Sequence, residues 1–149
     1  MAFFRLIILF FLFSHFVDSD STNLPINKKN WKDLNKLRQP YSSKDNIIDI
    51  FVNFDCSRCK HLLETINTLD PEQLGNYTIF IWSLDENKSK KSNLLISKNL
   101  KLKFIGPKLF FEFVPSHPPV LYRHKANQIM YHGPKSLELQ SLDSRKLFD

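Results

Sequence analysis

The chain contains only two cysteines and three glycines among its 149 residues. A single cysteine pair excludes a small scaffold held together by several disulfides. So few glycines exclude a collagen-like or glycine-rich low-complexity protein. Hydrophobic residues make up 42% of the chain and aromatic residues 13%, which is sufficient for a packed core. We therefore expect one globular domain.

The chain also lacks a concentrated basic stripe. Its formal net charge is +6, but the basic residues are mostly lysines scattered through residues 28–108. They are not interleaved with aromatic residues, as a surface that binds single-stranded nucleic acid would require. A solvated, lysine-rich surface explains the charge. We therefore expect no nucleic-acid partner.

The longest apolar run lies at the N-terminus. Arg5 precedes an unbroken apolar segment at residues 6–13, and Val17 and Ser19 fit the small-residue pattern before a cleavage site. The segment is too short to span a bilayer core, which needs about 20 residues. This pattern predicts a signal peptide at residues 1–19.

We expect a single domain at residues 20–149, and export would place it outside the cytoplasm. The chain does not end in a retention signal for the endoplasmic reticulum, so the bacterial periplasm is favoured over that lumen. An uncleaved membrane anchor at residues 3–17 remains the alternative, because this stretch is mostly apolar. In an oxidising compartment the two cysteines can persist as a disulfide.

The central feature of the sequence is residues 46–69. Residues 46–54 carry β-branched and aromatic side chains at both odd and even positions, which predicts a strand covered on both faces. From Ser57 the apolar residues recur at intervals of three and four, as on one side of a helix. Cys56 and Cys59, in a Cys-x-x-Cys motif, lie at the junction. A thiol at a helix N-terminus faces unpaired backbone N–H groups, which stabilise its thiolate.

The C-terminal part predicts a β-hairpin followed by a helix. The hairpin strands are expected at residues 120–124 and 128–131, around a polar turn. Pro134 stands where the first turn of a helix tolerates proline. Pro119 immediately precedes the first hairpin strand.

Together these features resemble the thioredoxin superfamily. The resemblance implies an α/β fold whose central mixed sheet is flanked by helices. It implies a thiol-disulfide oxidoreductase without a cofactor, in which Cys56 is the exposed nucleophile and Cys59 the shielded resolving thiol. Pro119 matches the family's cis-proline opposite the pair, and Pro118 as the cis residue is the alternative. The implied partners are protein thiols or disulfides and a membrane or periplasmic redox partner.

The residues around the pair are expected to adjust its chemistry. Ser57 and Arg58 separate the cysteines, and Lys60 and His61 follow. Positive charge favours the thiolate, which stabilises the reduced form and makes the disulfide more oxidising. Asp55 acts in the opposite direction. We therefore expect a reduction potential above that of thioredoxin.

Three departures from the family pattern keep other functions open. Ile50 replaces the family's buried carboxylate six residues before the first cysteine, and Asp49 is expected to face the other side of the strand. Pro118 has no N–H to offer a substrate chain, and Asp55 replaces a frequent tryptophan. One alternative is a non-enzymatic adaptor or assembly module of a cell-envelope complex, with a structural disulfide.

A zinc site is a further alternative. The two cysteines and two of the four histidines at positions 61, 117, 124 and 132 could form a Cys2His2 set. The sequence has no ligand spacing beyond the Cys-x-x-Cys, so we expect no metal. His117 is expected to lie near the cis-proline, where it could influence the thiol.

The remaining segments complete an α/β order. A short amphipathic helix is expected at residues 31–37, before Pro40, and a second strand, parallel to the first, at residues 77–84. A helix is expected through residues 94–102. Residues 109–114 fit an extra edge strand, an apolar lip beside the site or a buried segment.

Overall fold

The structure is a computed structural model, and it describes most of the chain between residues 26 and 137. The described residues are 26–39, 46–69, 72, 77–85, 100–125, 128–134 and 137. The signal peptide predicted at residues 1–19 and most of the helix predicted after Pro134 lie outside them. None of the described helices is both long and apolar enough to cross a membrane.

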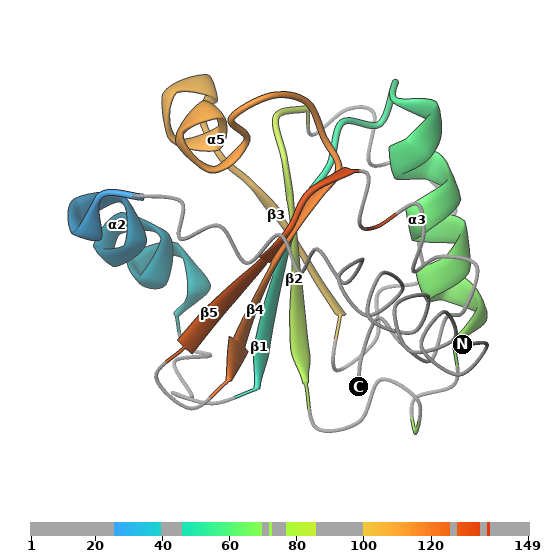
Figure 1. The fold of residues 1–149 in the computed structure, drawn as a ribbon, viewed down its shortest axis with the longest axis horizontal. Coiled ribbons are helices and arrows are strands. Elements are labelled where there is room, and N and C mark those ends of the chain that lie inside the picture. Colours follow the sequence, from blue (N-terminus) through green and yellow to red (C-terminus); the bar gives the residue numbers. More distant parts are fainter. Residues whose placement is uncertain are drawn as a thin grey trace, which may run out of the picture.

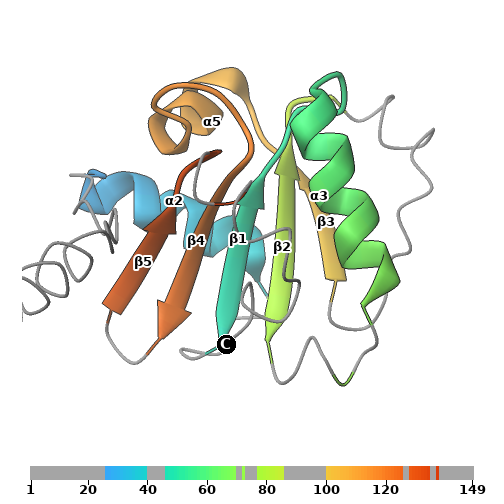
Figure 2. The same ribbon diagram turned by 45° about the vertical axis from the view of Figure 1, so that its right-hand side comes forward.

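The described residues form an α/β fold with an open, mixed, five-stranded sheet (Figure 1). The strand order is β3-β2-β1-β4-β5, which Figure 2 shows side by side. β1 pairs parallel with β2, and β2 parallel with β3, whereas β4 is antiparallel to both β1 and β5. The strands are β1 (Ile47–Phe51), β2 (Thr78–Ser83), β3 (Leu100–Phe104), β4 (Val120–Lys125) and β5 (Gln128–His132).

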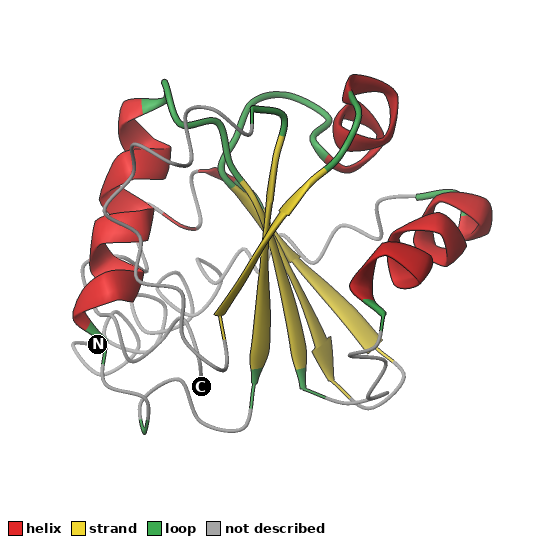
Figure 3. Ribbon diagram, turned by 180° about the vertical axis from the view of Figure 1, so that it is seen from behind, coloured by secondary structure: helices red, strands yellow, loops and turns green. Residues whose placement is uncertain are grey.

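Helices cover both faces of the sheet. Helix α3 (Ser57–Thr68) lies on one face, and α2 (Lys28–Arg38) and α5 (Pro107–Phe113) lie on the other (Figure 3). Three parts of the chain lie at the end of the sheet where β1 ends: the start of α3, helix α5 and the segment that leads into β4 (Figure 2). The fold therefore brings segments that are distant in the sequence to one edge.

The central strand β1 is buried along its whole length, as predicted. Because side chains alternate across a strand, Ile48 and Ile50 belong to the core beneath α3, whereas Ile47 and Phe51 belong to the core beneath α2 and α5. Asp49 shares the second face, because it lies between Ile48 and Ile50 in the sequence.

Several predicted elements are confirmed. The helix expected at residues 31–37 is α2, and the strand expected at 77–84 is β2, parallel to β1. The hairpin is confirmed as β4 and β5. The helix expected from Ser57 is α3, and its buried side contains Leu62, Leu63 and Ile66.

One prediction is wrong, and the alternatives for one further segment are decided. Leu100 and Leu102 lie in β3, not in a helix, because apolar and lysine residues alternate from Leu100 to Phe104 with the period of a strand. Residues 94–99 lie outside the described part. Of the alternatives for residues 109–114, the buried segment is confirmed and the edge strand and the lip are not: most of these residues lie in helix α5, which begins at Pro107. Its Phe110 and Phe113 are buried in the core beneath α2 and α5.

Candidate functional site

The two cysteines lie where β1 passes into α3. A tight turn joins the elements: Cys56 donates its backbone N–H to the carbonyl of Asn53 at 3.0 Å, and the Asn53 side chain accepts the N–H of Asp55 at 2.9 Å. Phe54, between them, is buried in the core beneath α3. Cys56 is thereby placed as the N-cap residue of α3.

The sulfur of Cys56 interacts with groups on two segments. It accepts a hydrogen bond from the backbone N–H of Cys59 at 3.3 Å, as an N-cap side chain does. Its thiol also donates to the carbonyl of Pro118 at 3.5 Å. Cys56 is partly exposed and Cys59 is fully buried, and both are free thiols in this structure. The expected difference in exposure is therefore confirmed.

The surroundings of Cys59 keep it protonated. Its sulfur accepts the backbone N–H of Asn53 at 3.4 Å. Burial, together with the neighbouring Cys56 thiol, raises the pKa of Cys59 far above that of a free thiol. At neutral pH Cys59 is consequently a thiol.

A cis peptide bond faces the cysteines, as expected. It joins Pro118 to Pro119, so that Pro119 is the cis-proline and the alternative at Pro118 is wrong. His117, just before this pair, lies with its Nε2 3.3 Å from an Nη atom of Arg58 on α3. This contact was not predicted, and it links the segment before β4 to Arg58, one of the two residues between the cysteines.

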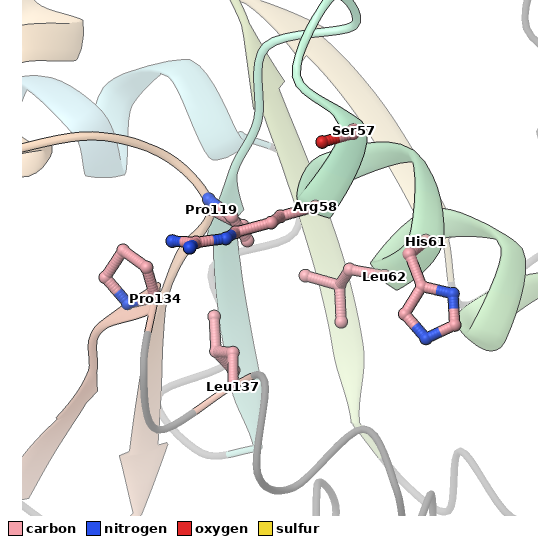
Figure 4. A pocket seen from close by; sticks show the side chains of 7 residues that line it. All are labelled: Ser57, Arg58, His61, Leu62, Pro119, Pro134 and Leu137. Carbon is pink, nitrogen blue, oxygen red and sulfur yellow. The ribbon is translucent and has the colours of Figure 1, made fainter.

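A pocket of about 200 Å³ opens beside the cysteines (Figure 4). It lies between the first turns of α3 and the start of the predicted C-terminal helix. Ser57 and Arg58, both expected to adjust the chemistry of the pair, line it. Among the described residues, the lining is Ser57, Arg58, His61, Leu62, Pro119, Pro134 and Leu137. The convergence of Leu62, Pro134 and Leu137 on this site was not predicted.

The carboxylate of Asp49 lies on the other face of the sheet, as expected. It is fully buried and paired with the Arg38 guanidinium, whose Nε lies 3.1 Å from Oδ1. The Trp82 indole donates to Oδ1 at 2.8 Å, and His124 Nε2 lies 2.8 Å from Oδ2. Burial alone would raise the pKa of Asp49, but these hydrogen bonds and the charge of Arg38 hold it below its usual value.

This cluster of Arg38, Asp49, Trp82 and His124 was missed in the sequence. The sequence signal that could have indicated this cluster is the single aspartate within an apolar strand. A buried carboxylate needs hydrogen-bond donors and a counter-charge. The position of Asp49 makes it a structural residue of the α2 side. Ile50, in contrast, packs in the same core as Cys59, so that β1 presents an apolar side chain and not a carboxylate to this core at position 50.

Neither a metal nor a related protein supplies further information about the site. In the described ranges, no group of three or more His, Cys, Asp or Glu side chains is arranged to hold a metal ion. No protein-family model matches the sequence, and no curated protein matches it.

Proposed function

We propose that this protein is a thiol-disulfide oxidoreductase of thioredoxin-like fold, which exchanges disulfides with protein substrates through Cys56 and Cys59. The observation that carries the proposal is the asymmetry of the pair. Cys56 is accessible, caps α3 and lies beside the Pro118–Pro119 bond, whereas Cys59 is buried one turn later. An exchange site needs an accessible attacking sulfur and a second thiol close enough to resolve the mixed disulfide. The mixed sheet with helices on both faces supports the thioredoxin-like fold.

The proposed reaction in the oxidising direction has two steps. A substrate thiolate attacks the Cys56 sulfur of the Cys56–Cys59 disulfide, a substrate–Cys56 disulfide forms, and Cys59 leaves and is protonated. A second substrate thiolate then attacks the substrate sulfur of the mixed disulfide, and Cys56 leaves. The substrate gains one disulfide and loses two electrons, which reduce the pair to two thiols.

The environment of Cys59 keeps the sulfur protonated once it has left the disulfide. Its raised pKa means that the proton is bound as soon as the sulfur leaves. Since Ile50 offers no carboxylate, this proton is proposed to come from solvent. Export through the predicted signal peptide would place the reaction in an oxidising compartment, the periplasm in our proposal.

The decisive experiment is equilibration of the purified protein in glutathione buffers of known ratio. The fraction of reduced pair, measured by thiol alkylation and mass spectrometry, gives the reduction potential. We expect a value above the roughly −270 mV of thioredoxin, since basic groups surround Cys56. A lower but reversible potential would contradict the expectation of an oxidant or isomerase and indicate a reductase.

Failure of the pair to titrate would contradict exchange chemistry itself. The alternative function, an adaptor or assembly module with a structural disulfide, would then lead. Pro118 favours that alternative, because it cannot offer the N–H that a docked substrate chain would use. The same titration of the Cys56→Ser variant serves as the control, since it has no pair to oxidise.

A further inference from the structure

The pocket beside Cys56 is placed where a reacting protein segment has to pass. Ser57 and Arg58, which line it, directly follow Cys56 in α3. Pro119, on the opposite wall, follows the residue whose carbonyl lies 3.5 Å from the Cys56 sulfur. A chain whose cysteine reaches Cys56 therefore brings its neighbouring side chains over the pocket.

The floor of the pocket is apolar. Leu62 and Leu137 are almost fully buried, and Pro119 and Pro134 complete the lining on the side of β4 (Figure 4). The volume of about 200 Å³ is below the roughly 300 to 1000 Å³ of pockets that enclose small molecules. Its size and lining therefore suit one apolar side chain of a bound segment rather than a cofactor.

The rim of the pocket is basic. The Arg58 side chain extends from α3 across the pocket towards Pro119 and Pro134, and His61 lies one turn further along the helix (Figure 4). None of the seven described lining residues is acidic. Asp55, the acidic residue nearest to Cys56 in the sequence, lies on the preceding turn and outside the lining. The field at the rim therefore favours a negatively charged group.

We infer that the preferred substrates carry an apolar side chain next to the reacting cysteine, which enters this pocket, and an acidic side chain beside it, which pairs with Arg58. The inference rests on the proposed function. A guanidinium has five N–H donors in a planar fork that matches a carboxylate, so Arg58 can bind one alongside the neighbours it already contacts. Arg58 is thereby assigned to substrate selection in addition to the chemistry of the pair.

The test uses short synthetic peptides whose single cysteine is joined by a disulfide to 5-thio-2-nitrobenzoate. The Cys56 thiolate of the reduced protein attacks the peptide sulfur, so that a Cys56–peptide disulfide forms and the coloured nitrobenzoate thiolate is released. Cys59 then attacks the Cys56 sulfur, which forms the Cys56–Cys59 disulfide and releases the peptide thiol. Two electrons pass from the pair to the probe.

Three peptides separate the two parts of the inference. One carries Leu and Asp beside the cysteine, one carries Leu and Lys, and one carries Ser and Asp. At low salt we expect the Leu–Asp peptide to react about three- to fivefold faster than the Leu–Lys peptide, the size of an exposed ion-pair effect. We also expect it to react faster than the Ser–Asp peptide, because serine does not fill the apolar floor.

The ratio between two peptides on one protein cancels any change in the reactivity of Cys56 itself. The intrinsic reactivity of each peptide is measured separately with a small thiol such as glutathione, and each rate with the protein is divided by that value. Arg58→Gln should lower the Asp-to-Lys ratio to near one. The matched control Lys60→Gln changes an exposed charge two residues further on that does not line the pocket, and it should retain the ratio.

The outcomes distinguish the inference from the proposed function. Equal rates for all three peptides would overturn the inference, while Cys56-dependent release would still support exchange chemistry. A ratio that persists in Arg58→Gln would overturn the role of Arg58. If the wild-type protein releases nitrobenzoate from none of the peptides faster than Cys56→Ser does, the proposed function fails and the inference fails with it.

Discussion

The sulfur of Cys56 accepts a hydrogen bond from the backbone N–H of Cys59 at 3.3 Å, so that one cysteine caps the helix whose first turn holds the other. Serine is among the preferred N-cap residues. A Cys56→Ser protein should therefore keep the cap and lose the chemistry. This relationship makes it possible to separate folding from reactivity at the site.

The first prediction concerns the resolving thiol. Cys59→Ser should accumulate mixed disulfides between Cys56 and its substrates, because no second thiol remains to release them. The complexes are measured as reducible high-mass bands after acid quenching and alkylation. Cys56→Ser, as the control, should form none and should remain within about 1 kcal/mol of the wild-type free energy of unfolding. Absence of trapped complexes with Cys59→Ser would favour the adaptor function.

The second prediction concerns the buried ion pair on the other face. Asp49→Asn leaves the Arg38 guanidinium without its counter-charge, and it should lower the free energy of unfolding by about 3 to 5 kcal/mol. Urea denaturation measures this loss. The reduction potential of the cysteines should stay unchanged, because Asp49 and Cys59 lie on opposite faces of the sheet. A shifted potential would show that the two faces are coupled.

An exposed ion pair supplies the control for that experiment. Asp33 and Lys36 lie 3.2 Å apart on α2, with side-chain exposures of 40% and 65%. Asp33→Asn should change the free energy of unfolding by less than about 1 kcal/mol. A comparable loss in both variants would mean that burial does not distinguish the two pairs.

The third prediction concerns pH. Burial, followed by the nearby positive charge of Arg123, lowers the pKa of His132, so the folded state favours its neutral form. An unfolded histidine titrates near pH 6.5, and its stabilising contribution is therefore complete above that value and is lost as the pH falls below it. His132→Gln should make the decline in stability between about pH 7 and pH 5 shallower. The exposed His61→Gln is the control, and an equal effect of both substitutions would contradict the assignment.

The lowered pKa of Asp49 adds a separate, more acidic transition. Its carboxylate is favoured in the folded state, so its contribution is complete above the unfolded value of about 3.9 and is lost as the pH falls through the lower folded value. Wild-type stability should consequently fall again below about pH 4, and this second fall should be smaller in Asp49→Asn. Denaturation series at fixed ionic strength measure both transitions.

The segments that were predicted correctly have strong local patterns. The strand before the cysteines, α3 and the β4–β5 hairpin each show a clear period or a run of β-branched residues next to turn signals. Pro119 could be assigned as the cis-proline because the resemblance to the thioredoxin superfamily implies one at the start of this strand. The strand β3 was not predicted, because its five residues are stabilised by pairing with β2. The apolar residues before it also extended a helical pattern.

The parts that were not predicted depend on contacts between distant segments. Asp49 meets Arg38, eleven residues before it, and His124, which comes from another strand. The pocket likewise combines α3 with Pro134 and Leu137 near the other end of the described chain. The sequence indicates that an aspartate in an apolar strand needs hydrogen-bond donors, but it does not indicate which residues supply them.

The fourth prediction uses two phenylalanines of the helix that the sequence left ambiguous. Phe113 is fully buried, stacked on Phe51 at 5.0 Å between ring centroids and in edge contact with Trp31 at 4.7 Å. Phe111, in the same helix, is 60% exposed. Phe113→Ala should lower the free energy of unfolding by about 3 to 5 kcal/mol, because it leaves a cavity among aromatic rings, whereas Phe111→Ala should change it by less than about 0.5 kcal/mol. Urea denaturation of the two variants tests the helical register directly: if Phe111→Ala is the more damaging substitution, α5 does not present the face described above to the sheet.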